Sequence, residues 1–246
     1  MKDYKWLTIK GTRHKDKPVI TDKLIKGERV YGDNVNLNKY LDSIRQYRKE
    51  GVKGINGSIV MNCNPFTLGH RYLVEYAASQ VETLYIFVVE EDSSYFPFKD
   101  RLELVKKGTE DIKNVVVFPS GNFIISAVTF PGYFYKDDMK DIKIDCSNDI
   151  NVFVQYIAPT LNIKIRFAGE EPLDPITNLY NDSMKEILPK YGMEFRSIPR
   201  KKVENGDDVI SASRVRLCLD KADFQEIKKF VPESTLNYLI EHYRNS

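Results

Sequence analysis

Ser58-Ile-Val-Met-Asn-Cys-Asn-Pro-Phe-Thr-Leu-Gly-His70 is the stretch that decides the fold. Its first four residues, Ser58 to Met61, form a short apolar run after Gly57, which predicts a buried strand. From Gly69 to Gln80 the apolar residues recur three or four positions apart, which predicts a helix with one buried face. The residues between the two form a strand-to-helix loop. Such a junction is the usual place for a phosphate in an open α/β sheet, because helix N-terminal N–H groups and the helix dipole favour an anion.

The rest of the chain repeats this alternation of strand and helix. Further strands are predicted at Leu84 to Val89, Val115 to Phe118, Ile163 to Phe167 and Glu194 to Ile198. Further helices are predicted at Asn36 to Glu50, Arg101 to Gly108, Asn178 to Leu188, Ser211 to Leu219 and Asp223 to Phe230. The alternation predicts a Rossmann-like α/β fold, in which helices cover both faces of a parallel sheet.

The length of 246 residues suits one large domain with a short extra element. Residues 1 to about 35 are polar and rich in Lys, with β-like runs such as Tyr4 to Ile9. We therefore predict an N-terminal appendage and helix over residues 1–50, followed by the main domain over residues 51–246.

Composition narrows the classes of function and the compartment. Lys and Arg number 37 against 35 for Asp and Glu, so the net charge of +2 gives no field that favours nucleic acid or a membrane surface. Three widely spaced cysteines and three histidines support neither a disulfide framework nor a zinc site. The chain shows no signal peptide and no apolar run long enough to span a membrane. We expect a cytoplasmic protein that binds anions locally.

The loop from Asn62 to His70 carries suitable chemistry for phosphate. Pro65 fixes the turn, Thr67 offers a hydroxyl at the helix start and Gly69 lets the backbone approach a ligand. His70, on the first helical turn, could donate to charge developing on a phosphoryl oxygen. A lone histidine near a helix start is more often a cap or a surface residue, so spacing alone leaves both readings open.

A second constellation lies at Ile210-Ser-Ala-Ser-Arg-Val-Arg216. Ser211 and Ser213 can cap a helix, and Arg214 and Arg216 lie near its first turn. The same residues describe an ordinary capped helix whose arginines face water.

Both stretches resemble the motifs of the nucleotidyltransferase superfamily. Asn64-Pro-Phe-Thr-Leu-Gly-His70 resembles its Thr/His-x-Gly-His element, and the second stretch resembles Ile-Ser-x-Ser/Thr-x-x-Arg. The resemblance implies the nucleotidyltransferase fold and catalytic roles for Thr67, His70 and Arg216. It also implies that the remaining motif positions contact the nucleotide, namely Asn62, Asn64, Phe66, Gly69, Ser211 and Ser213. Guanidinium and hydroxyl groups suit the departing pyrophosphate.

Within that superfamily the chain is similar to the citrate lyase ligases from about Gly54 to about Tyr238. The similarity includes 85–92, 96–105, 123–131 and 167–172 as well as the two motifs. It implies ATP and Mg²⁺, with acetate attacking the α-phosphate to give acetyl-adenylate. It further implies acyl transfer to the thiol of an acyl-carrier protein.

The similar segments supply further candidate residues. Lys99 is a candidate catalytic residue and Arg101 a candidate for binding substrate, although a Lys-Asp-Arg run that opens a helix is about as often a solvated face. Ser126 and Thr129 suit the wall of an acceptor pocket, or else a buried strand-to-loop segment. Gly169 and Glu170 follow a predicted strand, where such folds place loops that contact the nucleotide.

One departure keeps other functions open. Citrate lyase ligases usually carry an acetyltransferase-like domain ahead of the nucleotidyltransferase domain, and only about 55 residues precede the similarity here. That length is too short for such a domain. A cytidylyltransferase or adenylyltransferase that uses CTP or ATP and a phosphorylated alcohol, sugar phosphate or phosphonate is the first alternative. A nucleotide-binding module without turnover is the second. The oligomeric state stays open.

Overall fold

The structure is a computed structural model that describes residues 34–48, 54–90, 94–126, 129–130, 145–171, 174–202 and 209–244. The predicted run from Tyr4 to Ile9 lies outside these residues. Two compact units make up the chain, Met1–Lys39 and Tyr40–Ser246. Helix α1 (Asn34–Arg45) begins in the first unit and ends in the second.

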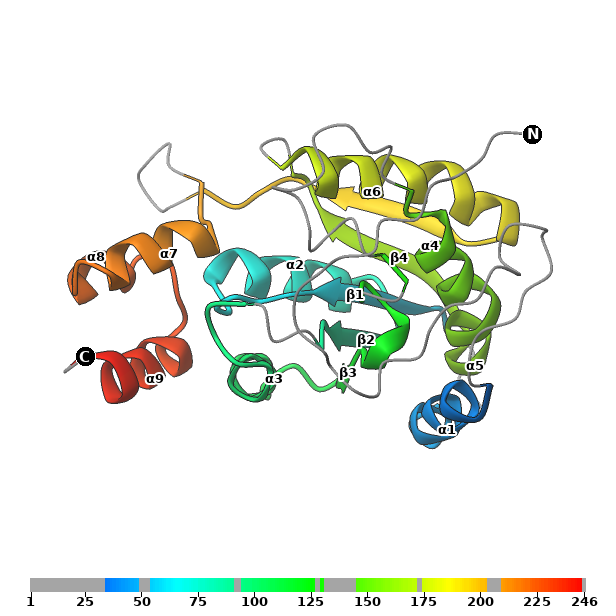
Figure 1. Cartoon of the computed structure of the whole chain (residues 1–246), viewed down its shortest axis with the longest axis horizontal. Coiled ribbons are helices and arrows are strands. Elements are labelled where there is room, and N and C mark those ends of the chain that lie inside the picture. The colour runs from blue at the N-terminus through cyan, green and yellow to red at the C-terminus, as the bar shows by residue number, and fades with distance from the viewer. Residues whose placement is uncertain are drawn as a thin grey trace, which may run out of the picture. The chain divides into compact units, whose positions relative to one another are not determined.

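Five strands among the described residues form one parallel sheet in the order β3-β2-β1-β4-β5 (Figure 1). The strands are β1 (Asn56–Met61), β2 (Thr83–Val88), β3 (Val115–Pro119), β4 (Ile163–Gly169) and β5 (Glu194–Ile198). All five were predicted, and the Rossmann-like fold is confirmed. The strand order reverses between β1 and β4, and an open α/β sheet binds its ligand at the carboxyl ends of the strands beside such a reversal.

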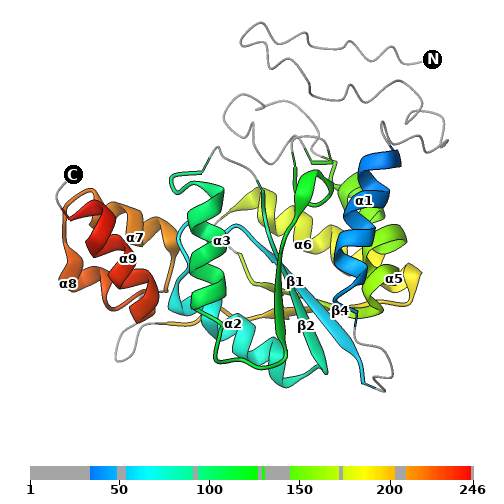
Figure 2. The same ribbon diagram turned by 90° about the horizontal axis from the view of Figure 1, so that it is seen from below.

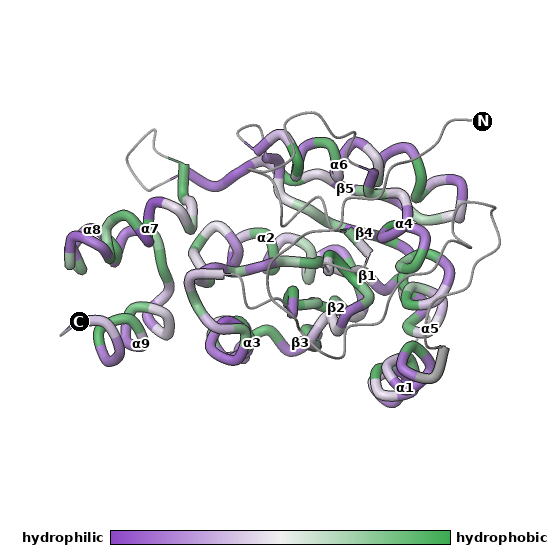
Figure 3. The backbone as a smooth tube through the Cα atoms, viewed as in Figure 1, coloured by the Kyte–Doolittle hydropathy of each residue, from purple (hydrophilic) through white to green (hydrophobic). Residues whose placement is uncertain are grey.

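Helices cover both faces of the sheet (Figure 2). On one face lie α2 (Leu68–Ser79) and α3 (Phe98–Lys107), which share a core with the strands. On the other lie α4 (Ser147–Val152), a π-helical turn (Phe153–Ile157), α5 (Ala158–Leu161) and α6 (Pro175–Ile187). Because both faces are covered, every residue of β2 is buried, and its continuous apolar run is the expected pattern. In Figure 3 the central strands are largely hydrophobic, whereas the helices alternate.

Three C-terminal helices build a second core beside the first. They are α7 (Ala212–Leu219), α8 (Phe224–Ile227) and α9 (Glu233–Tyr243), and they bury Phe96 among their apolar residues. The backbone N–H of Leu68 donates to the carbonyl of Phe230 at 2.8 Å. This bond joins the start of α2, which carries the first motif, to the C-terminal helices, which carry the second.

Some elements were not foreseen. The helical run from Ser147 to Leu161 contains the apolar stretch Val152-Phe-Val, which has no amphipathic spacing because the run is buried on more than one side. Helix α9 was also missed, although Pro232 precedes it and its apolar residues have helical spacing. Short 3₁₀ turns occur at Gly121–Phe123 and Leu188–Tyr191. No helix within the described residues is long and apolar enough to cross a membrane.

Candidate active site

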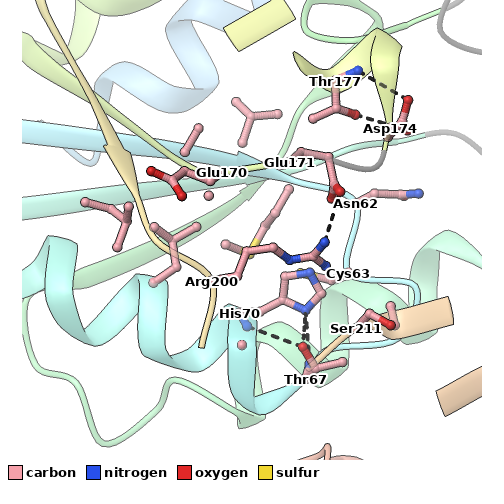
Figure 4. A pocket seen from close by; sticks show the side chains of 18 of the residues that line it. Asn62, Cys63, Thr67, His70, Glu170, Glu171, Asp174, Thr177, Arg200 and Ser211 are labelled. Carbon is pink, nitrogen blue, oxygen red and sulfur yellow. Dashed lines mark hydrogen bonds and ion pairs between the residues drawn. The ribbon is translucent and has the colours of Figure 1, made fainter. Parts of the chain in front are cut away.

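A cavity of about 390 Å³ lies at the carboxyl ends of β1 and β4, a volume typical of sites for small molecules (Figure 4). Ten of the predicted site residues line it: Asn62, Asn64, Thr67, Gly69, His70, Gly169, Glu170, Ser211, Ser213 and Arg216. Five others do not: Phe66, Lys99, Arg101, Ser126 and Thr129. The loop after β1, the end of β4 and the start of α7 therefore meet around one cavity.

Thr67 and His70 form a reciprocal cap at the start of α2. The Thr67 hydroxyl accepts from the His70 backbone N–H at 3.3 Å, and the imidazole Nδ1 accepts from the Thr67 backbone N–H at 3.0 Å. A capping box usually has Glu or Gln at the position that His70 occupies. The cap satisfies two helix-end donors and at the same time fixes the direction of the imidazole (Figure 4).

The cap also determines the protonation state of His70. A backbone N–H only donates, so Nδ1 must be the unprotonated nitrogen and Nε2 carries the proton. Burial, together with the nearby charge of Arg200, lowers the pKa of His70 to about 4. The ring of Phe66 stacks on the imidazole, with centroids 5.8 Å apart. His70 is therefore neutral near pH 7 and presents a fixed N–H donor, while Phe66 supports it from the core.

Arg216 links the second motif to the first. Its Nη1 donates to the carbonyl of Asn64, and its Nη2 donates to the Ser213 hydroxyl at 3.0 Å. Ser211 caps α7 by accepting from the Arg214 backbone N–H at 3.2 Å. The Arg214 side chain lies toward Glu226 and the Phe230 ring and does not line the cavity. Of the two arginines, only Arg216 reaches the site.

Arg101 lies beneath the loop and not on the wall of the cavity. Its guanidinium is completely buried and donates to the carbonyls of Asn62, Val89 and Phe96 at 2.8 to 3.0 Å, and to the Asn62 side-chain oxygen at 2.7 Å. Arg101 therefore supports the segments that follow β1 and β2. It does not line the cavity, where a residue that binds substrate was predicted. Lys99 is exposed on the first turn of α3, away from the cavity.

Ser126 and Thr129 do not line the cavity but lie close behind its wall. Both are buried, and Thr129 donates to the Asp149 carboxylate at 2.6 Å. Tyr180 donates to the other oxygen of the same carboxylate, also at 2.6 Å, and its side chain does line the cavity. The two predicted residues thus hold the wall in place from outside it.

The glycines of the site fit an approaching ligand. A side chain added at Gly69 would make only ordinary van der Waals contacts, the nearest at 3.5 Å. At Gly169 an added Cβ would meet nothing within 4 Å. The fold itself therefore requires glycine at neither position, and both positions leave room for the close approach of a ligand.

Several residues that line the cavity were not predicted. Arg200 follows β5 and pairs with Glu171 at 2.9 Å (Figure 4). Lys201, the next residue, also lines the cavity. The run Arg200-Lys-Lys202 directly after a predicted strand was a usable signal, because loops at strand carboxyl ends build such sites. Arg166 on β4 also lines the cavity. Its position inside a predicted strand gave no sign that it would reach a site.

The described residues do not bring together enough side chains to bind a resident metal ion. No group of three or more His, Cys, Asp or Glu side chains close enough for a metal occurs within the part of the chain that the structure describes. Mg²⁺ usually binds through substrate phosphates and one or two carboxylates, and keeps several waters. Glu170 lines the cavity and is exposed, so the site is compatible with a metal that arrives with its nucleotide.

Comparison with known proteins adds family information to this geometry. Residues 56–239 match the family described as citrate lyase ligase C-terminal domain. The [citrate [pro-3S]-lyase] ligase of Escherichia coli is 42% identical over 85% of this chain and 60% of its own length. The corresponding ligase of Klebsiella pneumoniae is 41% identical over 83% of this chain and 60% of its own length. The chain thus spans about three fifths of these curated relatives.

One solved structure illustrates the similarity beyond these relatives. Thermotoga maritima TmcAL bound with alpha-thio ATP has a TM-score of 0.46 at 13% identity, over 78% of this chain and 56% of that chain.

Proposed function

This chain belongs to the citrate lyase ligase family, and we propose that it transfers an adenylyl group from ATP to acetate or another small carboxylate. Pyrophosphate is the second product. The observation that carries the proposal is that His70 and Arg216, 146 residues apart in sequence, line one cavity, with Arg216 bonded to the Asn64 carbonyl of the loop that leads to His70. These are the two groups that phosphoryl transfer needs, a fixed donor for the reacting phosphate and a cation for the leaving group.

His70 acts on the α-phosphate as a hydrogen-bond donor. Its Nε2–H is already oriented by the cap, so no reorganisation is needed when negative charge grows on a non-bridging oxygen. A proton-accepting role does not fit, because Nδ1 is occupied and Nε2 is protonated. None is needed with this acceptor, since a carboxylate is ionised at neutral pH and attacks without losing a proton.

Arg216 and the start of α7 act on the departing pyrophosphate. The guanidinium is held on two sides, by the Asn64 carbonyl and the Ser213 hydroxyl, and keeps further N–H groups for phosphate oxygens. Thr67 serves mainly through the cap, and Gly69 gives the phosphates room near the backbone. Mg²⁺, bound with ATP, would supply charge neutralisation on the phosphates, with Glu170 as the exposed carboxylate of the cavity.

Transfer of the acetyl group to the thiol of an acyl-carrier protein is the further step that we propose from family membership. The relatives are named for the ligase reaction on citrate lyase. The carrier is therefore the partner to test after adenylyl transfer has been measured.

Pyrophosphate release by the purified protein with Mg²⁺ tests the proposal. ATP and CTP are each supplied with acetate, with other small carboxylates and with phosphorylated or phosphonate acceptors. We expect release with ATP and acetate. Release only with CTP or a phosphorylated acceptor would replace the proposed reaction, and no release with any pair would favour a binding module.

A further inference from the structure

Arg166 is a buried cation whose Nη1 atom has no hydrogen-bonding partner among the described residues. It lies in the middle of β4, where its neighbours Ile165 and Phe167 point into the core shared with α2 and α3. Since side chains alternate along a strand, Arg166 points to the opposite face. Only 3% of the residue is exposed, and it lines the cavity described above.

The surroundings of Arg166 compensate its charge only in part. The Phe153 ring covers one face of the guanidinium, with Cζ 4.4 Å from the ring centroid. Its Nη1 donates to none of the described residues. Buried charges are normally paired and hydrogen-bonded, because an unpaired one carries a large desolvation cost. The desolvation cost of this arginine is therefore not offset by the described residues alone.

Asp149 is the obvious partner, yet its carboxylate accepts its hydrogen bonds from other groups. The Thr129 hydroxyl and the Ile125 backbone N–H both donate to its Oδ1, and the Tyr180 hydroxyl donates to its Oδ2. No ion pair joins Asp149 to Arg166 among the described residues. The Asp149 carboxylate stabilises the charged form of the Arg166 guanidinium through space, without a hydrogen bond between them among the described residues. The N–H groups of Arg166 therefore do not bond to Asp149.

We propose that Arg166 binds the carboxylate of the acceptor and selects short monocarboxylates as the substrate class. This inference rests on the proposed adenylyl transfer. Arginine matches a carboxylate with two parallel N–H···O bonds, which would supply Nη1 with the partner that the described residues do not provide. Arg166 and His70 line the same cavity, so a small acceptor can reach the guanidinium and the reacting phosphate together.

The reaction balances with the acceptor held in this way. One carboxylate oxygen attacks the α-phosphorus of ATP and forms the new O–P bond. The bond from that phosphorus to the bridging oxygen of the β-phosphate breaks, and its electron pair leaves with pyrophosphate. No proton moves, so the product pair is the acyl-adenylate and pyrophosphate.

The same wall disfavours a phosphorylated acceptor. Among the described residues of β4 and α6 that line the cavity, Arg166 is the only cation, and the carboxylates of Glu170, after β4, and Asp174, before α6, also line the cavity. The other cations of the cavity, Arg200, Lys201 and Arg216, come from the segment after β5 and from α7. Val60, Ile125 and Met184 add apolar surface. One cation beside apolar side chains suits a single negative charge with a short hydrocarbon tail, whereas a dianion usually needs several donors.

Steady-state kinetics of three variants test the inference. Arg166→Met removes the guanidinium at similar length, Arg166→Lys keeps the charge without the planar donor set, and Arg196→Met is the matched control on β5. Arg196 pairs with Glu194 outside the cavity. We expect the KM for acetate to rise by about 100-fold in Arg166→Met and about 10-fold in Arg166→Lys, with the KM for ATP within about twofold. Arg196→Met should leave both constants unchanged.

A binding measurement separates this inference from the proposed function. Acetate should raise the melting temperature of the unsubstituted protein in the presence of a non-hydrolysable ATP analogue, and should not do so in Arg166→Met. That result without any pyrophosphate release would uphold the acceptor site and refute adenylyl transfer. Active Arg166→Met with an unchanged KM for acetate would refute the acceptor site and leave adenylyl transfer standing. If Arg166→Met does not fold, the KM for acetate in Arg166→Lys decides by the same criterion.

Discussion

Replacing His70 by Asn separates the two jobs that the imidazole performs. The Oδ1 atom of Asn lies at about the position of Nδ1, so it can accept from the Thr67 backbone N–H and preserve the cap. Nothing in Asn reaches the position of Nε2. We therefore expect His70→Asn to retain the free energy of unfolding and to lower kcat by about 10²- to 10³-fold, the usual cost of removing one fixed donor to developing charge.

His70→Ala is the matched comparison, because it removes both the donor and the cap. Its kcat should fall as far as that of His70→Asn, while its free energy of unfolding should drop by about 1 kcal/mol for the lost capping bond at 3.0 Å. Pyrophosphate release gives kcat, and denaturant unfolding gives the stability of each variant. A His70→Asn protein with normal kcat would refute the donor assignment, and equal stability of both variants would refute the role of the imidazole in the cap.

Three further predictions follow from the same contacts. Arg216→Lys keeps a positive charge but cannot bond the Asn64 carbonyl and the Ser213 hydroxyl together, so kcat/KM for ATP should fall by about 10²-fold, and a normal value would remove Arg216 from the site. Arg101→Met leaves three buried carbonyls without their donor and should lower the free energy of unfolding by about 3 kcal/mol or more, against about 0.5 kcal/mol or less for the exposed Lys106→Met. The folded pKa of His70 is about 4, below its ordinary value of 6.5, so the unfolded chain binds a proton first and stability should fall as pH drops from about 6.5 to 4. Across that range kcat should stay level down to about pH 5, and a kinetic limb near pH 6.5 or a melting temperature insensitive to acid would contradict the neutral imidazole.

The sequence allowed much of the sheet to be predicted because β2 and β3 are continuous apolar runs and β1 ends in one. Both faces of β1, β2 and β4 are covered, so most of their residues are buried and apolar. The meeting of the two motifs could also be anticipated, since strand carboxyl ends lie at one edge of a parallel sheet. What brings Arg216 to Asn64 is the packing of α7 to α9 on the start of α2, and part of that packing, α9, was missed.

The direction of a side chain could not be predicted in the same way. Arg101 stands in a Lys-Asp-Arg run that suits a solvated helix face, yet its guanidinium is completely buried against backbone carbonyls. Arg166 stands within an apolar strand, and only the structure shows that it lines a cavity. Whether a charged residue is turned inward depends on partners that are distant in sequence, here the carbonyls of Asn62 and Val89 or the ring of Phe153.

The electrostatic arrangement of the cavity favours an acceptor that arrives with its negative charge already formed. His70 cannot take a proton at neutral pH, because its Nδ1 is occupied by the Thr67 amide and its pKa lies near 4. An unionised alcohol would need a base at the position that His70 occupies as a donor. An anionic acceptor instead needs a cation to hold it beside the anionic nucleotide, and Arg166 is a buried cation that lines the cavity and whose Nη1 has no partner among the described residues. The neutral His70 and the buried Arg166 thus favour the same nucleophile, a small carboxylate.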